Sequence, residues 1–500
     1  MKKILFIIAA AMITLVSCEK SFDVTNTGNP SGEDMAAKIT EDPGFMGSYV
    51  TGFYASLVAY GGNHDMYGLL SVLLNLDHMG ADIVHDGTPN WGKYDYVQDY
   101  GLDEWGRTAQ FWSTFYTLIG KCNEVIDFIP ADEDPEIPVI RSYLGQAYAL
   151  RAFAYTYLML IYQDPVDQSG AFRTDAPAVP LVYAGRDGIS ADDAQSRQGR
   201  NPMSMIMEHV EDNLAKAFAL LEGTPRASKM EVDYSVAQGF AARYYLFTQQ
   251  WEKAAEAADI ALQGYDIMDK SRLYSGFMEI EDPEVMWGFN HSTETQTAYA
   301  SFFSHMSNSS SGYSGIGQMV KCIDKSLYDQ IPATDFRKGL FNGPEGNPSA
   351  ATEGAKYPYA ALKFGYDSQW LQDYIFMRAS EMYLIKAEAL ARTGATGEAA
   401  AAMKPLMQKR DLGYNKSSVD VEDVLLQRRI ELWGEGFVYF DLRRNGLDCI
   451  RVYEGSNHPE WARKNYPAHA DSWNFQIPLK EVQENDWISD EDQNPWSSGA

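Results

Sequence analysis

The chain has 500 residues, of which 45% are hydrophobic and 13% aromatic, and its formal net charge at pH 7 is −28. The hydrophobic content excludes wholesale disorder, and the length allows two or three domains or one large helical array. The negative charge argues against binding to nucleic acid and against wide contact with anionic lipid, because both need Lys and Arg to offset phosphate charge.

The first residues have the pattern of an export signal. Lys2 and Lys3 precede a short apolar run, and the small residue Ser17 stands before Cys18. The run is too short for a comfortable membrane-spanning helix. Residues 15–18, LVSC, resemble a bacterial lipobox, in which the cysteine becomes the lipid-bearing N-terminus. We therefore predict a lipoprotein signal peptide at 1–17, lipidation of Cys18 and a polar, flexible tether at 18–44; a plain signal peptide that contains a cysteine is the alternative.

Three cysteines remain in the mature chain, Cys122, Cys322 and Cys449. An odd number in an exported chain of this size is no disulfide framework, and the spacings match no zinc pattern. We expect buried thiols.

From about residue 45 the chain has globular character, and its strongest periodic signals are helical. Apolar residues recur at three- and four-residue steps within about 109–162, 202–264 and 374–434. Alanine-rich helices joined by a short turn are typical of tetratricopeptide-type pairs. Such pairs cannot bury their apolar faces alone, so the sequence predicts a mainly α protein in which they stack into a right-handed superhelix.

Long segments rich in Gly, Pro, Asn and aromatic residues separate the helix pairs, at about 61–106, 266–365 and 446–500. Loops this long in a compact protein are either functional or a second structural layer. The segment 266–365 has the length of an inserted subdomain, and EVMWGF within it is predicted to be a short strand. We therefore predict a loop-rich layer with a few short strands that carries the ligand and partner contacts.

The segment 427–446, QRRIELWGEGFVYFDLRRNG, is unusually aromatic for a solvated helix face and unusually charged for a core. Its helical spacing lets arginines and glutamates pair on the helix surface. It could be a catalytic carboxylate cluster, a ligand site or a structural clasp.

This segment resembles the C-terminal signature of the SusD/RagB family. Four other stretches resemble family motifs and stand along the chain in the family's order: RAFAYTYLMLIYQDPV, RNPMSMIMEHVEDNLAKA, RASEMYLIKAEALARTG and WNFQIPLKEVQEN. Together with the lipobox, these matches span nearly the whole chain. The chain departs from the family pattern at Gln163-Asp164, where Gly is usual, and at Phe437, where Arg is usual.

The resemblance implies a lipoprotein of a Gram-negative nutrient-uptake system, anchored in the outer membrane by its N-terminal lipid and facing outward. Such proteins resemble lids over a SusC-like, TonB-dependent outer-membrane transporter. They capture oligosaccharides or sometimes other nutrients and have no catalytic activity. The resemblance also implies that the charged segment is a structural clasp, made of Arg428, Arg429, Glu431, Glu435, Asp441 and Arg443.

A sugar site needs aromatic faces for the ring and polar side chains for its hydroxyls. In the family, the ligand platform resembles exposed aromatic residues on non-repeat loops, and residues 78–100 and 287–315 offer them here. The predicted ligand residues are Asp82, Asn90, Trp91, Tyr94, Tyr96, Tyr299, Phe303 and Tyr313. Trp91 is the best single candidate, although it could instead pack on the body or against the transporter. Trp287 and Phe289 are predicted to be core, and Trp370 is a weaker candidate.

Other chemistry finds little support. The arginines around Glu431 and Glu435 keep both carboxyls ionised, whereas the general acid of a glycoside hydrolase needs a raised pKa. The histidines and aspartates between His64 and His85 lack the spacing of known metal motifs. No Gly-rich phosphate loop opens a helix and no G-x-S-x-G elbow is present, so we expect neither a cofactor nor an enzyme.

Two alternatives to a glycan-binding protein stay open. The chain could be a lid or scaffold subunit of the transporter complex with no carbohydrate site, or it could bind a non-glycan nutrient such as a peptide.

Overall fold

In a computed structural model, residues 32–86, 92–129 and 137–497 are described. The predictions for Cys18, Asn90 and Trp91 lie outside these residues.

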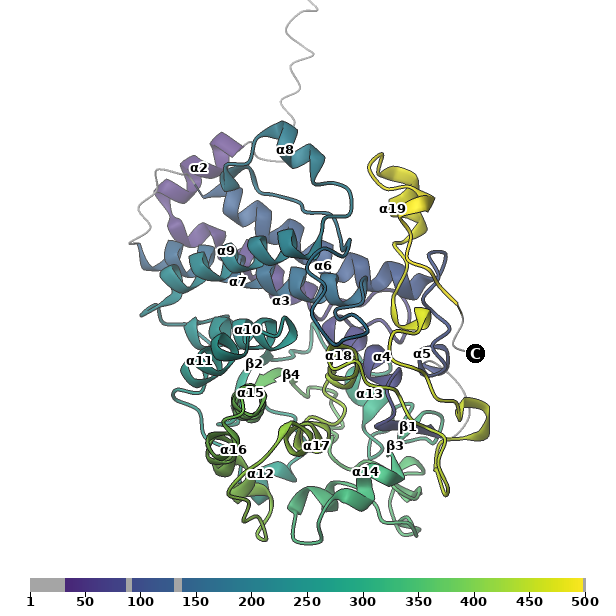
Figure 1. Cartoon of the computed structure of the whole chain (residues 1–500). Coiled ribbons are helices and arrows are strands. Elements are labelled where there is room, and N and C mark those ends of the chain that lie inside the picture. Colours follow the sequence, from purple (N-terminus) through teal and green to yellow (C-terminus); the bar gives the residue numbers. More distant parts are fainter. Residues whose placement is uncertain (1–31, 87–91, 130–136, 498–500) are drawn as a thin grey trace, which may run out of the picture.

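Helices dominate the described residues (Figure 1). The longer ones are α2 (Gly32–Glu41), α3 (Gly47–Ser56), α4 (Leu69–His78), α6 (Gly106–Phe128), α7 (Pro138–Ile161), α9 (Met203–Leu221), α10 (Tyr234–Phe247), α11 (Trp251–Ala261), α15 (Ala379–Arg392), α16 (Thr396–Arg410) and α17 (Val421–Glu431). The shorter ones are α5 (Lys93–Tyr96), α8 (Ala191–Ser196), α12 (Lys270–Leu273), α13 (Phe302–Met306), α14 (Lys325–Gln330), α18 (Val438–Arg444) and α19 (Leu479–Glu484). Short 3₁₀ helices lie at Pro43–Met46, Gly185–Asp187, Phe336–Leu340, Gly354–Lys356, Glu460–Ala462, Asp471–Trp473 and Asp490–Asp492.

The scaffold is a continuous series of packed helices. Helix α6 packs on α7, α7 on α9, α9 on α10, α10 on α11, α11 on α15, and α15 on both α16 and α17. In Figure 1 this series runs from α6, α7 and α9 in the upper half to α16 at the lower left and α17 beside it in the lower middle. Small residues allow the close approach, since a Cβ on Gly145 of α7 would lie 2.5 Å from the side chain of Leu221 on α9. The predicted fold class, mainly α with tetratricopeptide-like helix pairs, is confirmed.

Four short strands form two antiparallel pairs within the described residues. Strand β1 (Ile83–Asp86) pairs with β3 (Val320–Ile323), and β2 (Val285–Phe289) pairs with β4 (Tyr374–Arg378). The strand expected at EVMWGF is therefore present as β2. Residues 374–378 were predicted to belong to a helix pair, but they form β4, and α15 begins only after them. Because β2 and β3 both pair with strands outside 266–365, that segment is joined to the rest of the fold.

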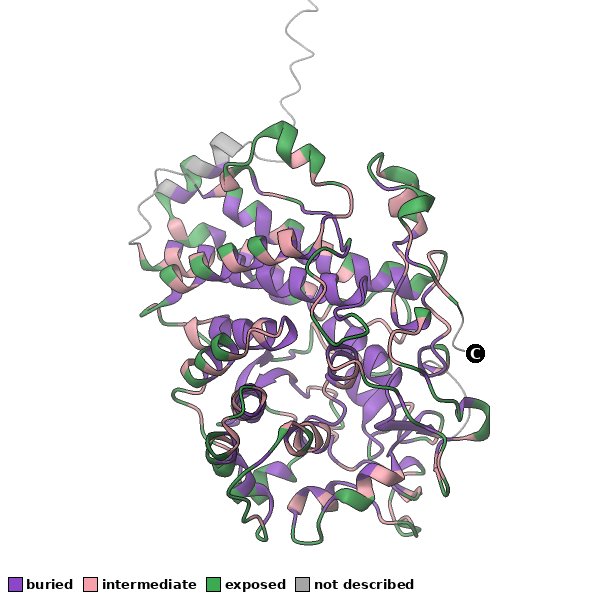
Figure 2. Ribbon diagram, in the orientation of Figure 1, coloured by how far each residue is buried: buried purple, intermediate pink, exposed green. Residues whose placement is uncertain are grey.

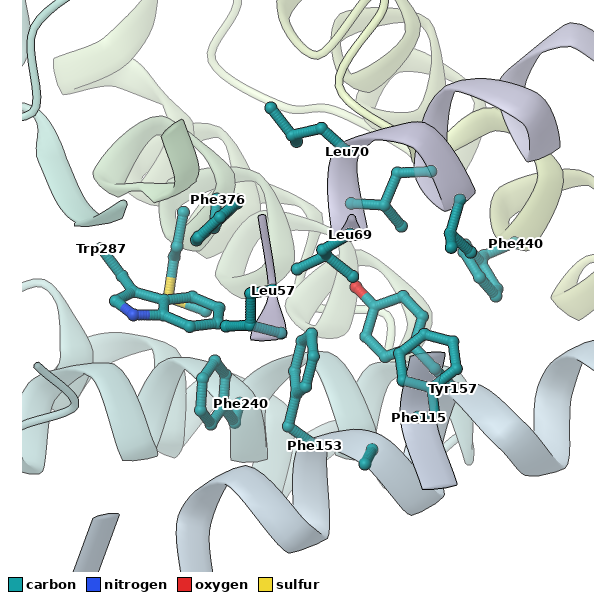
Figure 3. Packing of buried hydrophobic residues seen from close by; sticks show 14 of the residues in the cluster. Leu57, Leu69, Leu70, Phe115, Phe153, Tyr157, Phe240, Trp287, Phe376 and Phe440 are labelled. Carbon is teal, nitrogen blue, oxygen red and sulfur yellow. The ribbon is translucent and has the colours of Figure 1, made fainter. Parts of the chain in front are cut away.

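The main core lies where the scaffold meets the loop layer (Figures 2 and 3). Trp287 of β2 packs against Phe153 of α7 and Phe376 of β4, with ring centroids 5.6 Å and 4.8 Å apart. Tyr157 of α7 packs on Phe440 of α18 at 5.1 Å. Trp287 is fully buried and Phe289 is 5% exposed, as predicted for core residues. The three described cysteines, Cys122, Cys322 and Cys449, are buried free thiols, also as predicted.

A buried ion network centred on Glu431 joins the scaffold to the loop layer. The Glu431 carboxylate lies 3.2 Å from the guanidinium of Arg337, 2.8 Å from Arg378 and 3.0 Å from Arg410. Glu284, which precedes β2, adds ion pairs of 2.5 Å to Arg378 and 2.8 Å to Arg410. These five side chains are all at most 1% exposed. They come from separate elements, so the network fixes how those elements pack.

A second buried network joins α15, α17 and α18. Glu388 of α15 lies 2.6 Å from Arg444 of α18 and 3.7 Å from Arg428 of α17. Asp441 pairs with Arg428 at 2.9 Å and with Arg444 at 2.8 Å. The C-terminal helices are thereby held to the scaffold.

The spacing of the predicted clasp residues suggests that they pair with one another along the surface of one helix. In the structure most of them pair instead with residues on other elements. Glu431 turns toward arginines from three other elements, and Glu435 pairs with Arg378 and Lys363 at 2.7 Å and 2.5 Å. Arg429 pairs with Asp82, 2.6 Å away and 347 residues earlier in the chain.

Arg443 donates hydrogen bonds to the main-chain oxygens of Leu160 and Gln163. Most of the six residues therefore connect distant parts of the fold, whereas Asp441 pairs within the segment, with Arg428 and Arg444.

Replacement of Glu431 by Gln should destabilise the protein by about 3–5 kcal/mol, because it leaves buried guanidinium groups without their shared counter-charge. Urea unfolding at pH 7 measures this loss. The matched control is Glu353→Gln, which breaks the exposed pair with Lys356 and should leave the unfolding midpoint close to that of the wild type. Equal midpoints for the two variants would contradict a structural role for Glu431.

The same carboxyls predict a pH dependence. Burial alone would raise the pKa of Glu388, Glu431, Glu435 and Asp441, but the neighbouring cations outweigh it and hold each pKa below its usual value. The unfolded chain therefore takes up protons first, near the ordinary glutamate pKa of 4.5, and the stabilisation is lost as the pH falls through the folded pKa.

Buried histidines act in the same direction at higher pH. Burial lowers the pKa of His78, His85 and His305, so protonation of the unfolded chain below about pH 6.5 reduces stability. Between pH 6.5 and 5 buried Asp77 opposes them, because burial raises its pKa to about 8 and the folded chain keeps its proton. We therefore expect the steep fall of the thermal midpoint below pH 4.5, and we expect Glu431→Gln to flatten it. A midpoint that rises between pH 5 and 4 would exclude this account.

Candidate functional site

Arg107, in the first turn of α6, organises one face of the loop layer. Its buried guanidinium takes both carboxylate oxygens of Asp95 at 2.8 Å, and it lies 2.6 Å from Asp65 and 2.6 Å from the side-chain oxygen of Gln110. The planar guanidinium suits such two-bond pairing. It therefore fixes the start of α6 against α5 and against the loop that carries Asp65.

Three aromatic rings stack on the α5 side of Arg107. Tyr94 lies 4.6 Å from Tyr100 and 6.3 Å from Trp105 between ring centroids, and Tyr100 lies 5.0 Å from Trp105. Tyr94 and Trp105 are each 40% exposed, so their outer faces meet solvent. The ammonium of Lys93 lies 5.6 Å from the Tyr94 ring and 5.9 Å from the ring of Trp461, which is also exposed.

A second aromatic group lies next to Asp65, another partner of Arg107. The His64 and Tyr299 rings are stacked with centroids 6.3 Å apart, and Tyr313 lies 5.4 Å from Tyr299. The Tyr313 hydroxyl is 2.5 Å from Nδ1 of His64. Burial and the neighbouring Tyr299 and Tyr60 raise the pKa of Tyr313, which keeps its hydroxyl protonated. Tyr60 and Tyr299 are each 50% exposed.

Arg107 links the two groups into one region of the surface, directly to the first and through its partner Asp65 to the second. Its guanidinium carbon lies 5.4 Å from the Tyr100 ring, and its partner Asp65 is the chain neighbour of His64. A cavity of about 380 Å³ adjoins them, with Tyr60, Gly61, Met66, Gly106 and Gln110 in its wall. We name this surface the aromatic platform: Tyr60, His64, Tyr94, Tyr100, Trp105, Tyr299 and Tyr313.

The structure places only part of the predicted ligand set on this platform. Tyr94, Tyr299 and Tyr313 lie on it. Asn90 and Trp91 lie outside the described residues. Trp370 is half-buried beside Tyr366, with ring centroids 5.1 Å apart.

Asp82, Tyr96 and Phe303 are buried, which corrects the expectation that they face a ligand. The Asp82 carboxylate is paired with Arg429, and its main-chain oxygen accepts a hydrogen bond from the Trp433 indole at 2.8 Å.

Tyr96 lies under the guanidinium of Arg451, 4.1 Å from its ring. Phe303 belongs to α13, which is buried along its whole length. Asp82 and Tyr96 are therefore each covered by an arginine more than 340 residues later in the chain.

Tyr60, His64 and Trp105 are platform residues that the sequence reasoning missed. Trp105 stands in the polar, Gly-flanked stretch GLDEWGR. Trp91 was proposed because it is a tryptophan beside glycine in a polar stretch, and the same pattern could have identified Trp105.

The charged clasp has no room for a substrate. Cavities of about 10 and 20 Å³ adjoin it, beside Arg428 and Glu435, and each has a volume no larger than about one water molecule needs. With their pKa values held low, Glu431 and Glu435 also lack the raised pKa of a general acid. The geometry therefore excludes the clasp as a site of hydrolysis.

Neither a metal cluster nor a membrane-spanning helix stands out in the described part of the chain. No three His, Cys, Asp or Glu side chains gather there as metal ligands would. No described helix has both the length and the apolar content to cross a bilayer.

Comparisons with known proteins agree with the fold and the motifs. A family model described as "SusD family" matches residues 363–496, and one described as "Starch-binding associating with outer membrane" matches residues 75–246. SusD-like protein P2 of Formosa agariphila is 24% identical over 495 residues, covering 89% of this chain and 91% of that protein.

Solved structures share the architecture. A SusD-like carbohydrate binding protein from Bacteroides vulgatus superposes with a TM-score of 0.75 at 24% identity, covering 91% of this chain and 98% of that one. Surface glycan-binding protein A from Bacteroides thetaiotaomicron, solved in complex with laminarihexaose, has a TM-score of 0.66 at 15% identity, covering 90% and 99%.

Proposed function

Because the chain belongs to the SusD-like family, we propose that it is a non-catalytic cell-surface protein that captures glycans on the aromatic platform. It passes them to a SusC-like, TonB-dependent transporter in the outer membrane. The observation that carries this proposal is the platform itself, a set of outward-facing rings held in place by a buried arginine. Laminarihexaose binding by a structural neighbour supports a glycan as the ligand class.

The platform has the chemistry that a sugar needs. The outer faces of Tyr94, Trp105 and Tyr299 can cover the C–H faces of pyranose rings, while His64 and the tyrosine hydroxyls can meet sugar hydroxyls. Because the rings already pack on one another, binding orders few side chains, which favours affinity. Asn90 and Trp91, just before Lys93 and Tyr94 in the sequence, stay proposed ligand residues.

An exposed apolar strip supports a protein partner. Leu447, Ile450 and Val452 are 44%, 46% and 49% exposed on one short segment between α18 and the chain's last helices. Apolar side chains clustered on a surface mark protein contacts more often than scattered ones do. We propose that this strip contacts the transporter; it also favours the second candidate function, a lid or scaffold subunit without a glycan site.

Glycan capture is tested by isothermal titration against a panel of soluble glycans, among them laminari-, malto-, xylo- and manno-oligosaccharides, with peptides beside them. Trp105→Ala and Tyr299→Ala should each weaken glycan binding about tenfold, or about 1.4 kcal/mol. The control is Tyr274→Ala, which removes an equally exposed ring near α12, away from the platform.

Two results would contradict glycan capture. Binding of a peptide but no glycan at millimolar concentration would assign the platform to a non-glycan nutrient. Binding of neither, with a lower transporter affinity in Trp105→Ala, would favour the lid or scaffold function.

The proposed location is the outer membrane, with the chain anchored through lipid on Cys18 and facing outward. Wild-type protein expressed with its signal should partition into the detergent phase, since acyl chains contribute about 0.8 kcal/mol per buried CH₂. Cys18→Ala should move the protein to the aqueous phase, and Cys122→Ala is the control. A wild type found wholly in the aqueous phase would exclude the anchor.

A further inference from the structure

A second and larger cavity lies farther along α6. Its volume is about 710 Å³, and its wall combines α6, the segments around 180–182 and 195–198, and the end of α19. Binding pockets for small molecules commonly have volumes of about 300–1,000 Å³. Trp487 lies in this wall and is 46% exposed, so one large indole face is open to a ligand.

The groove is held open by hydrogen bonds rather than by chance packing. The Asn485 side chain donates to the main-chain oxygen of Gln198 at 2.9 Å and accepts from the Trp487 main-chain N–H at 2.9 Å. On the opposite wall the Tyr116 hydroxyl donates to the Pro180 oxygen at 2.8 Å. The main chain at Trp487 is thereby held at the rim.

The two cavities meet on the exposed face of α6. Both are lined by Ser113 and Thr117, and the one at the platform also includes Gly106 and Ala109. A Cβ placed on Gly106 would meet no atom within 4 Å, so the surface is open there. At about 1.5 Å of rise per residue, the path along α6 from Trp105 to Thr117 is about 18 Å long.

The lining of the larger groove favours an uncharged ligand rich in hydroxyl groups. Glu481, Glu484 and Asp486 lie in its wall, and the wall contains no Lys or Arg. This field repels uronate or sulfate groups, while carboxylates and the amides of Gln195 and Gln198 can bond sugar hydroxyls.

We propose that the groove at Trp487 is a second subsite for a neutral glycan, which runs from the aromatic platform along α6 and over Ser113 and Thr117. This inference rests on the proposed glycan capture and adds a ligand class: long, neutral oligosaccharides. The two subsites act on one chain, so the second raises affinity only for glycans long enough to reach it.

The test uses the full-length protein and a length series, from disaccharide to decasaccharide, of whichever neutral panel glycan binds; laminari-oligosaccharides are tried first. Trp487→Ala should leave the Kd of the shortest bound chain within twofold and weaken the longest at least fivefold. Ser113→Trp, which fills the junction of the two cavities, should do the same. Trp105→Ala should weaken all lengths.

The control for added bulk is Glu124→Trp, at an exposed position of α6 that lines neither cavity. It should bind every length as the wild type does. Circular dichroism of all variants should match the wild type, since Ser113, Glu124 and Trp487 are exposed.

Wild-type affinity for all lengths in both Trp487→Ala and Ser113→Trp would overturn the second subsite while leaving glycan capture intact. If no glycan binds the wild type, glycan capture and the second subsite fall together. A tetralysine peptide that binds the wild type but not Trp487→Ala, with glycan binding unchanged, would also overturn the inference and assign the acidic groove to a basic polypeptide.

Discussion

The fold depends on one buried carboxylate, that of Glu431, which is surrounded by three guanidinium groups. Taking these charges out of water costs several kcal/mol for each ion, and only close pairing with good geometry offsets that cost. Arg337, Arg378 and Arg410 supply the pairing from three different elements. Since the charges are satisfied only when all three elements are in place, the network selects one arrangement of scaffold and loop layer.

The aromatic platform repeats this chemistry on a smaller scale. Arg107 is buried and bound by Asp65 and Asp95, and it holds the start of α6 against α5 and against the loop that carries Asp65. The rings of the platform are then free to face outward, because none of them is needed to close the core. A rigid scaffold that leaves its irregular segments free for recognition is a common division of labour in proteins.

Residues whose surroundings are local could be predicted from the sequence, and residues covered by distant segments could not. The helix pairs and strand β2 follow from short-range periodicity, so Trp287 could be assigned to the core. Tyr96 and Asp82 sit in polar, loop-like sequence, yet Arg451 and Arg429, more than 340 residues later, bury them. The residue types in the segment 427–446 were enough to predict a clasp. They could not predict which residues pair, because most of the partners lie outside this segment.

This long-range pairing has a consequence for biosynthesis. Asp77 and Asp82 leave the ribosome early, but they meet the main-chain N–H groups of Gly436 and Val438 and the guanidinium of Arg429 only after some 350 further residues. Until then the carboxyl groups of Asp77, in α4, and of Asp82, just before β1, lack these particular partners, so this part of the fold is completed late in synthesis. The last steps of folding therefore wait for the C-terminal helices α17 and α18, whatever the order in which the earlier helices form.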